Sequence, residues 1–452
     1  MTDTIVALST PPGMGALGII RLSGDQSIAI ADSLLKGKNL TGAASHTVHF
    51  GVLKDKVGKL IDEVVVTIFR SPTSFTKEDT VEISCHGSNY ILQTVLKLCV
   101  DSGARLAEPG EYTQRAFLNG RFDLTQAEAV GDLIASESEA AHRTAMQQMR
   151  GGFSKEIQQL RERLIHFASM IELELDFSEE DVEFADRKEL LDLVERILKV
   201  VKSLIASFEL GNVMKNGIPI VIAGKPNVGK STLLNALLNE EKAIVSDIPG
   251  TTRDVIEDTL NINGILFRFV DTAGLRETDD VVEAMGVDKT KKKMQQASLI
   301  IYLIDLENAV EYELKKEINK LKAQQTPFLL VGNKEDLPLH PVRTFLKDQN
   351  ALFISAKEKT NLDVLRSRLL EVSRSKDLKT EGTVVTNIRH YQSLKATKCA
   401  LDNVVEGVHN KITHDFLAID IRQSLHHLGE ITGEVTTDEL LGNIFSNFCI
   451  GK

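Results

Sequence analysis

The sequence predicts a multidomain protein that combines α/β and all-α parts, and three observations indicate this. In residues 215–375, strand-like apolar runs alternate with helical segments, which is typical of a doubly wound sheet. The segments on both sides, residues 119–210 and 387–448, show helical periodicity. Residues 1–118 contain strand-like runs separated by Gly and Pro, which predicts a separate α/β domain.

The composition is that of a soluble globular protein. With 452 residues, 42% hydrophobic and 26% charged, the chain is long enough for two or three domains. The net charge of −11 argues against indiscriminate nucleic-acid binding, although it allows a local basic patch or an RNA contact through a partner. The lack of Trp, with only 5% aromatic residues, argues against a base-stacking platform.

The chain is expected to be cytoplasmic. No apolar run approaches the ~18 residues of a membrane span, and the N-terminus lacks the basic start and apolar core of a leader. The four cysteines show neither CxxC pairs nor metal-ligand spacing, so reduced thiols are expected.

In the predicted N-terminal domain, residues 1–118, four segments have the composition of strands. They are Ile5–Leu8, Gly18–Leu22, Val64–Phe69 and Thr80–Ser84. Breaks at residues 11–13 and 109–110 contain Pro and Gly, which predicts turns there.

Two helical segments are expected to form one discontinuous domain, residues 119–212 and 378–452. Apolar residues repeat at helical spacing in both segments: Leu190, Val194, Ile197, Val201 and Leu204 in the first, and Leu417, Ile421, Leu425 and Leu428 in the second. The acidic run at residues 178–183 is expected to be a solvated loop.

Residues 213–377 are expected to form a domain inserted between these two segments. Its predicted strands are Ile218–Ala223, Phe267–Val270, Leu299–Asp305, Phe328–Val331 and Leu352–Ile354. Ligands of such a sheet bind at the carboxyl ends of the strands.

The segment Gly224–Ser231 follows the first of these strands and fits the pattern G-x-x-x-x-G-K-[ST]. In this pattern backbone N–H groups surround phosphates, the Lys reaches the β and γ oxygens, and the Ser hydroxyl binds Mg²⁺. Lys230 is therefore a candidate catalytic residue and Ser231 a candidate magnesium ligand.

Two later motifs specify the nucleotide. In Asp271-Thr272-Ala273-Gly274, the Asp can hold the Mg²⁺ shell and the Gly leaves room for an N–H to meet the γ-phosphate. In Asn333-Lys334-Glu335-Asp336, the Asp can accept from guanine N1–H and its 2-amino group. Adenine would leave that carboxylate unpaired, at a cost of ~10⁴-fold in discrimination. Ser355-Ala356-Lys357 would direct N–H groups to guanine O6, so the sequence predicts a GTPase domain.

Leu275 occupies the position after D-x-x-G where related enzymes carry a water-orienting Gln. An apolar side chain cannot orient water. Either another group does so, or the intrinsic rate of hydrolysis is low.

The whole chain resembles the tRNA modification GTPase family MnmE (TrmE). The segments that carry the resemblance are Asp3-Thr4-Ile5-Val6-Ala7, Pro11-Pro12-Gly13, residues 108–121 (EPGEYTQRAFLNGR), residues 123–129 (DLTQAEA), Glu430-Ile431-Thr432-Gly433-Glu434 and the ending Phe448-Cys449-Ile450-Gly451-Lys452. The ending is the most specific of them.

The resemblance implies a folate-binding, dimerising N-terminal domain, a helical domain made from two chain segments, and an inserted Ras-like G domain. It implies a homodimer that acts with the flavoprotein MnmG, which carries FAD, in a heterotetramer or larger complex. Together they would add an aminomethyl or carboxymethylaminomethyl group to C5 of the wobble uridine (position 34) of certain tRNAs. A tetrahydrofolate derivative (5,10-methylene or 5-formyl) would supply the carbon.

The resemblance also extends the GTP site. The expected nucleotide-binding residues are Asn227, Val228, Gly229, Lys230, Ser231, Thr232, Ser246, Asp247, Ile248, Pro249, Gly250, Thr251, Thr252, Asp271, Thr272, Ala273, Gly274, Asn333, Lys334, Asp336, Ser355, Ala356 and Lys357. Mg²⁺ would be bound by Ser231 and Thr252. K⁺ would be bound by Asn227, Ser246, Ile248 and Thr251, placing positive charge where an arginine finger would otherwise act.

Glu283 matches the family carboxylate that positions water, through a second water; its alternative role is that of a solvated helix-start Glu. Ser246 stands where the family often has Thr. If only a carbonyl or hydroxyl is needed there, Ser serves equally, whereas a packing role for the Thr methyl would imply weaker K⁺ binding.

By the same resemblance, the folate would be bound by Arg21, Glu82, Arg121 and Lys452. A carboxylate suits the N–H edge of the pterin, and basic residues suit the tail or formyl group. The residues around His86 depart from the family pattern. Cys449 is either a nucleophile or one-carbon acceptor, or a small packed residue beside Phe448 and Ile450.

Two alternatives use the same motifs differently. A GTP-controlled ribosome-assembly or RNA-binding switch shares the phosphate loop and the apolar residue after D-x-x-G, but usually adds a basic RNA-binding module. A sensor of stress or pH could use His426 and His427, although adjacent residues of a helix point in different directions and are more simply surface residues.

Overall fold

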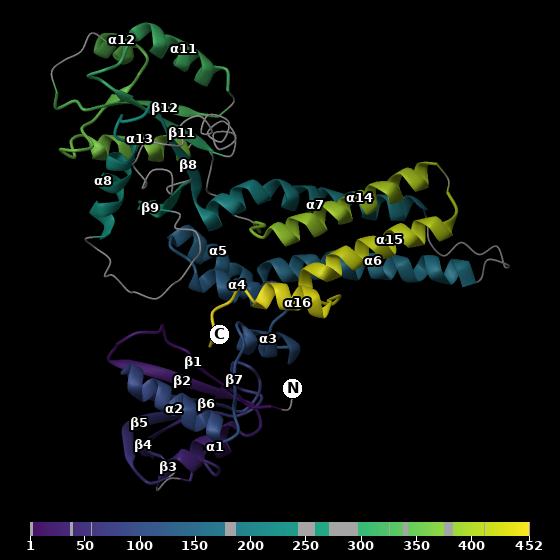
Figure 1. Cartoon of the computed structure of the whole chain (residues 1–452). Coiled ribbons are helices and arrows are strands. Elements are labelled where there is room, and N and C mark those ends of the chain that lie inside the picture. The colour runs from purple at the N-terminus through teal and green to yellow at the C-terminus, as the bar shows by residue number, and fades with distance from the viewer. Residues whose placement is uncertain are drawn as a thin grey trace. The chain divides into compact units, whose positions relative to one another are not determined.

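The computed structural model describes residues 3–36, 39–55, 57–176, 187–242, 258–270, 297–324, 326–337, 342–374, 383–410 and 412–451. The chain forms two compact units. The first contains Met1–Ala135, Ala145–Ile205 and Ile388–Lys452, and the second contains Ser136–Thr144 and Ala206–Asn387. The α/β and all-α parts described below confirm the predicted fold class, whereas the domain boundaries given above stay predictions (Figure 1).

The N-terminal part of the first unit is built on a seven-stranded sheet with the order β3-β4-β5-β6-β2-β1-β7. Its strands are β1 (Ile5–Leu8), β2 (Leu17–Ser23), β3 (Leu35–Lys36), β4 (Thr47–Lys54), β5 (Leu60–Phe69), β6 (Thr80–His86) and β7 (Arg105–Leu106). The four strands expected from the sequence are confirmed. Strand β4 was missed, and it contains Gly51, where a Cβ would lie only 2.1 Å from Leu35 Cδ2.

One face of this sheet is buried under α1 (Ser27–Leu34) and α2 (Asn89–Asp101). Because side chains alternate along a strand, Val64 and Val66 of β5 point into this core while Val65 points to the other face. That other face carries the exposed side chains of Val48 and Phe50 on β4.

The all-α part comes from two separate segments of the chain, coloured blue to teal and yellow in Figure 1. Its helices are α3 (Glu111–Leu118), α4 (Leu124–Ile134), α5 (Glu139–Met149), α6 (Gly152–Asp176), α7 (Arg187–Asn216), α14 (Ile388–His409), α15 (His414–Thr432) and α16 (Asp438–Phe445). Helix α15 packs against both α14 and α6. A capping box starts α4, in which Asp123 and Gln126 each accept the other's backbone N–H.

The predicted apolar face of α7 is confirmed, since its five residues from Leu190 to Leu204 are buried. The face predicted for α15 is correct at Leu417, Ile421 and Leu428, but Leu425 is only half-buried. Ser424 is fully buried beside it and satisfies its hydroxyl by donating to Asp420 O (2.9 Å).

The second unit contains a six-stranded sheet with the order β13-β12-β11-β8-β10-β9. Its strands are β8 (Ile218–Ala223), β9 (Asp258–Ile262), β10 (Ile265–Phe269), β11 (Leu299–Asp305), β12 (Phe328–Asn333) and β13 (Leu352–Phe353). All described pairs are parallel except β9 with β10. Strand β9 was not predicted, because this short edge strand contains polar residues that interrupt the apolar pattern expected of a strand.

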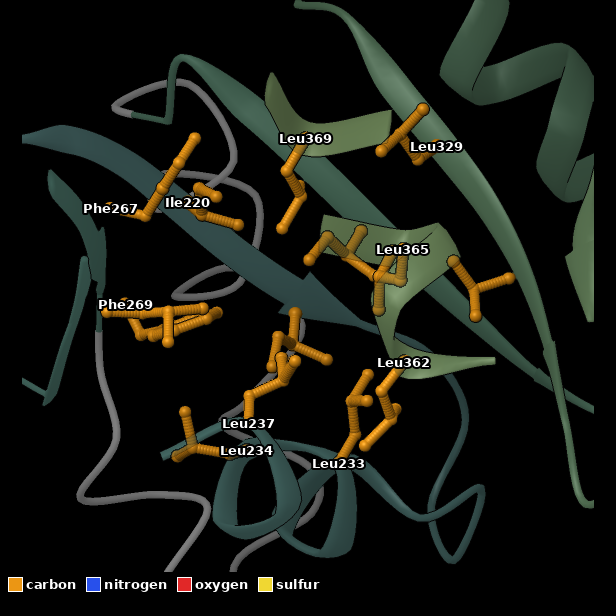
Figure 2. Close-up of a cluster of buried hydrophobic side chains, with 14 of the residues drawn as sticks. Ile220, Leu233, Leu234, Leu237, Phe267, Phe269, Leu329, Leu362, Leu365 and Leu369 are labelled. Atoms are coloured by element: carbon orange, nitrogen blue, oxygen red, sulfur yellow. The ribbon is translucent and has the colours of Figure 1, made fainter. Parts of the chain in front are cut away.

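Helices cover both faces of this second sheet, as expected for a doubly wound fold. Helices α8 (Lys230–Lys242) and α13 (Leu362–Arg374) pack on one face, and α11 (Glu311–Lys322) and α12 (Val342–Asp348) on the other. Figure 2 shows the first of these cores, to which Leu237 of α8, Leu365 of α13 and Phe269 of β10 all contribute. Because helices cover both faces, a ligand is expected to bind at the carboxyl ends of the strands.

Candidate functional site

The loop between β8 and α8 has the backbone geometry that phosphate binding requires. Gly224, Asn227 and Gly229 have φ of 153°, 58° and 96°, so the chain curls before α8 begins at Lys230. A Cβ on Gly229 would lie 2.4 Å from Asn333 Nδ2, so only Gly fits there. A helix N-terminus behind such a loop is a common anion-binding arrangement.

Lys230 folds back across this loop. Its Nζ donates to Gly224 O (3.1 Å) and Lys225 O (2.9 Å), which keeps the positive charge within the curl of the backbone. The next two predicted residues, Ser231 and Thr232, lie in the first turn of α8.

Asn333 connects the phosphate loop to the second predicted base-binding loop. Its Nδ2 donates to Val228 O (2.8 Å), and its Oδ1 accepts from Ala356 N (3.0 Å). The side chain is 3% exposed, so both bonds are shielded from water. The structure thus brings the phosphate loop together with two motifs that lie more than 100 residues further along the chain.

The two charged residues after Asn333 are also held in place. Lys334 has φ 68° and pairs with Asp305 at 2.7 Å. Burial raises the pKa of Asp305, but the hydrogen bonds from Lys334 and Asn308 lower this pKa by a larger amount. The net pKa of Asp305 is therefore below its usual value. A hydrogen bond from Ser355 lowers the pKa of the exposed Asp336, which stays ionised as guanine recognition would need.

Asp305 is a residue that the sequence analysis assigned only to a strand. The signal was present, because Asp305 ends the apolar run of β11 at the carboxyl edge of the sheet. A charge at that position in a buried parallel strand indicates a functional or supporting role.

Several predicted site residues lie outside the described residues, and their geometry is not part of this structure. They are Ser246, Asp247, Ile248, Pro249, Gly250, Thr251, Thr252, Asp271, Thr272, Ala273, Gly274, Glu283 and Lys452. Of the expected cation ligands, Asn227 and Ser231 are described. Within the described ranges, no group of three His, Cys, Asp or Glu is placed to hold a metal ion.

A second candidate site lies in the N-terminal part, at a cavity of about 380 Å³. Its lining consists of His46, Phe69, Pro72, Thr73, Ser74, Phe75, Lys77, Thr80, Glu82 and Arg121. Two of the four residues predicted to bind folate, Glu82 and Arg121, therefore line this cavity.

Arg21 joins them through two contacts. It pairs with Glu82 at 2.7 Å, directly across strands β2 and β6. Its guanidinium lies 5.7 Å from the centre of the Phe75 ring, and that of Arg121 lies 5.1 Å from the same ring. Phe75, which the sequence analysis did not identify, therefore positions both cations.

The loop that carries Phe75 is tied to helix α3. Arg115 of α3 is 1% exposed and pairs with Glu111 at 2.9 Å and with Glu78 at 3.2 Å. Burial would lower the pKa of Arg115, but Glu111 and Glu78 reverse this, so the net pKa is raised and the guanidinium stays charged. This network fixes the loop from its far end.

The C-terminal segment returns to the N-terminal sheet. Gly451 O accepts from Ser9 Oγ (3.3 Å), and Cys449 O accepts from Gly110 N (3.4 Å). A Cβ on Gly451, which has φ 93°, would lie 2.4 Å from Leu8 O. Cys449 is exposed, and the four cysteines are free. A solvent-accessible thiol does not fit the alternative of a buried, packed Cys449.

His426 and His427 do not diverge as the sequence analysis expected. Both contact Glu430, at 3.4 and 3.1 Å, and their ring centres are 5.6 Å apart. They are partly exposed, which agrees with their assignment as surface residues.

Comparisons with known proteins cover the whole chain. The family model described as the GTP-binding protein TrmE N-terminus matches residues 4–121, and that of the MnmE helical domain matches residues 124–449. A protein of Cytophaga hutchinsonii named tRNA modification GTPase MnmE is 60% identical over all of this chain and 98% of its own length. A protein of Christiangramia forsetii with the same name is 53% identical over the full length of both.

Two solved G domains match a smaller part of the chain. The G domain of FeoB from Methanococcus jannaschii is 23% identical over 35% of this chain and 98% of its own, with a TM-score of 0.26. The FeoB G domain of T. maritima is 21% identical over 34% and 98%, with a TM-score of 0.25. None of the helices in the described residues has the length and hydropathy needed to cross a bilayer.

Proposed function

The chain belongs to the tRNA modification GTPase MnmE family, and on that premise we propose that it hydrolyses GTP as part of tRNA modification. With the flavoprotein MnmG, which carries FAD, it adds an aminomethyl or carboxymethylaminomethyl group to C5 of the wobble uridine of certain tRNAs. It acts in the cytoplasm. The observation that carries the GTP-binding part is the Asn333 bridge, which joins the phosphate loop to the loop of Ser355 and Ala356.

The phosphate end of this site suits a nucleoside triphosphate. The positive-φ loop and the ammonium of Lys230 supply donors and charge for the phosphates, and α8 adds its N-terminus. The carboxylate of Asp336 accepts from the N–H groups of guanine, with Ser355, Ala356 and Lys357 beside it. This arrangement supports GTP over ATP.

We assign Mg²⁺ to Ser231 and Thr252, with Asp271 in the surrounding shell, and K⁺ to Asn227, Ser246, Ile248 and Thr251. When bound, these ions neutralise negative charge that develops on the phosphates. Glu283 positions the attacking water, since Leu275 cannot.

Hydrolysis measured in K⁺ and in Na⁺ at equal ionic strength tests the cation assignment, and equal rates would reject it. A Glu283→Ala protein with full single-turnover hydrolysis would reject the assignment of the water-positioning group.

The cavity beside Glu82 fits a tetrahydrofolate derivative, either 5,10-methylene or 5-formyl. Its volume, its aromatic wall and its combination of one carboxylate with several cations match a pterin with an anionic tail. Arg21, Glu82, Arg121 and Lys452 hold the ligand. When bound, the folate supplies the one-carbon unit. Gly451 packs against Leu8 of β1, and Ala7, the residue before Leu8, pairs with Arg21 across β1 and β2. This contact supports a position of the C-terminal segment near the cavity.

Cys449 acts as a nucleophile or one-carbon acceptor on this exposed terminal segment. A Cys449→Ser protein that still modifies tRNA would end that assignment.

The protein acts as a homodimer, in a heterotetramer or larger complex with MnmG. The open apolar face of the N-terminal sheet supports dimerisation, since contiguous exposed apolar surface marks interaction sites.

The deciding experiment removes the gene and measures wobble-uridine nucleosides of the host tRNA by mass spectrometry. Wild type and Asp336→Asn are then restored separately. Loss of the 5-aminomethyl-type nucleosides, with rescue by wild type alone, is the expected result. Unchanged nucleosides would overturn the proposal and favour the ribosome-assembly switch instead.

A further inference from the structure

The cavity beside Glu82 contains two cations that have no carboxylate partner among the described residues. Arg21 neutralises Glu82 at 2.7 Å. Lys77 Nζ donates to a carbonyl, Gly120 O (2.9 Å), and Arg121 Nη1 donates to Ser74 O (2.5 Å). Because carbonyls carry no formal charge, the cavity has an excess of positive charge, although the whole chain has a net charge of −11. It is therefore suited to an anionic ligand.

The backbone at Lys77 gives a second, independent indication. Lys77 has φ 58°, a conformation that side chains with a Cβ rarely adopt. Among the described residues, the non-glycine positions with positive φ that are not Asn are His46, Lys77, Lys334 and Lys359. Two of these four line this one cavity, and a third lies in the guanine motif. Unfavourable backbone geometry of this kind concentrates at ligand sites.

The loop also holds Lys77 in place. The residue that follows it, Glu78, binds Ser23 Oγ (2.8 Å) and the buried Arg115 (3.2 Å), while the bond to Gly120 O directs the ammonium toward the segment that carries Arg121. An ammonium has three N–H donors, so the bond to Gly120 leaves capacity for a ligand.

We propose that Lys77 is a carboxylate-binding residue of this cavity, which acts with Arg121 on the glutamyl carboxylates of a bound folate. The inference rests on the proposed folate site and deepens it. Arg21 and Glu82 hold the pterin end, and Lys77 makes the site prefer folates that carry a charged tail. The unfavourable φ is retained because a glycine at this position could not supply the ammonium.

The test measures binding of two ligands to the full-length protein by isothermal titration calorimetry. One ligand is 5-formyl-tetrahydrofolate, and the other is its diamide, in which both tail carboxylates are neutral. Wild type is expected to prefer the acid by about tenfold or more, the size of one charge-assisted hydrogen bond. Lys77→Gly, which relaxes the backbone, is expected to reduce this preference at least threefold by weakening only the acid, while Arg121 retains the remainder. Lys77→Arg is expected to restore most of it.

The paired ligands separate binding from folding, because a distorted loop weakens both by the same factor. Equal losses for the acid and the diamide, or an undiminished preference in Lys77→Gly, would overturn the role of Lys77. Lys97→Met is the matched control, because Lys97 is exposed on α2, which covers the opposite face of the sheet. If it reduced the preference equally, the effect would be one of general charge, and the inference would fail. If wild type binds neither ligand, the folate site itself is rejected.

Discussion

Asn333 shows how one side chain can align a whole nucleotide site. It is nearly fully buried, and both ends of its amide are used, one by Val228 O and the other by Ala356 N. A hydrogen bond that is shielded from water is costly to leave unmade. Two loops distant in the chain therefore keep a fixed spacing.

We expect Asn333→Ala to destabilise the second unit by about 2 to 4 kcal/mol, because two buried backbone groups lose their partners. The affinity for GDP should fall at least tenfold, since the loops separate. Urea unfolding and titration with a fluorescent GDP analogue measure the two effects. Asn319→Ala, an exposed position on α11, is the control. Unchanged GDP affinity in Asn333→Ala would show that the spacing is set elsewhere.

Gly229 is required at its position for two reasons. It has φ 96°, and a Cβ would lie 2.4 Å from Asn333 Nδ2. Gly229→Ala should therefore displace Asn333 and lower GDP affinity at least tenfold. Gly442→Ala in α16 is the matched control, because no atom lies within 4 Å of its added Cβ and Ala favours a helix. Equal GDP binding by both variants would contradict this reading of the loop.

At the scale of elements, one charged cluster joins helices from the two halves of the helical part. Glu128 of α4 binds Arg389 at 2.8 Å and His390 at 2.7 Å, both on α14. Arg389 also donates to Ile431 O (3.1 Å) near the end of α15. Glu128 lies more than 250 positions from Arg389 and His390, so the cluster fixes the packing of a discontinuous domain.

This cluster predicts a pH dependence of stability. Burial raises the pKa of Glu128, but His390 and Arg389 more than reverse this and lower it from 4.5 to about 2. A carboxyl with a depressed pKa stabilises the fold above its unfolded pKa, and the contribution is lost as the pH falls from about 4.5 to 2. The full effect corresponds to about 3 kcal/mol, of which about 2 kcal/mol should be lost between pH 6 and pH 3.

Glu128→Gln should lack this part of the pH dependence, and it should already be destabilised at pH 7 because Arg389 loses its charged partner. Urea unfolding at pH 6, 4 and 3 measures the slope for both proteins. Glu439→Gln, at an exposed position of α16, should behave like wild type. An identical slope in Glu128→Gln would show that other carboxyls control acid unfolding.

At the scale of the whole molecule, the N-terminal sheet has one covered face, while its other face is buried at β1 but open at β4 and β5. Phe50 and Val65 are direct partners across β4 and β5, and both point away from the core, with 58% and 39% of their surfaces exposed. Val48 adds to the same apolar surface. Water contact with such a surface is unfavourable, so association of two copies would stabilise it.

Phe50→Glu should therefore shift the proposed dimer to a monomer of 49.9 kDa, because it places a charge within that surface. Light scattering coupled to size exclusion measures the mass. Tyr312→Glu, which alters a similarly exposed aromatic residue on α11, should leave the dimer intact. A Phe50→Glu dimer at micromolar concentration would place the interface elsewhere.

The sequence by itself determined the local elements and the chemistry of the nucleotide motifs. Strands β1 and β8 begin and end where their apolar runs do, and β11 continues one residue further to Asp305, because buried strands are mainly apolar. The phosphate loop was recognisable because its glycines and Lys230 act through local backbone geometry.

Only the tertiary structure decided which distant residues meet. It brought Asn333 between two loops, joined Glu128 to Arg389, and placed Phe75 and Lys77 in the same cavity as Glu82. Each of these contacts depends on side chains whose positions are set by packing between elements. Local periodicity and motif spacing hold no information about that packing, because it follows from how sheets and helices from distant parts of the chain bury their apolar faces together.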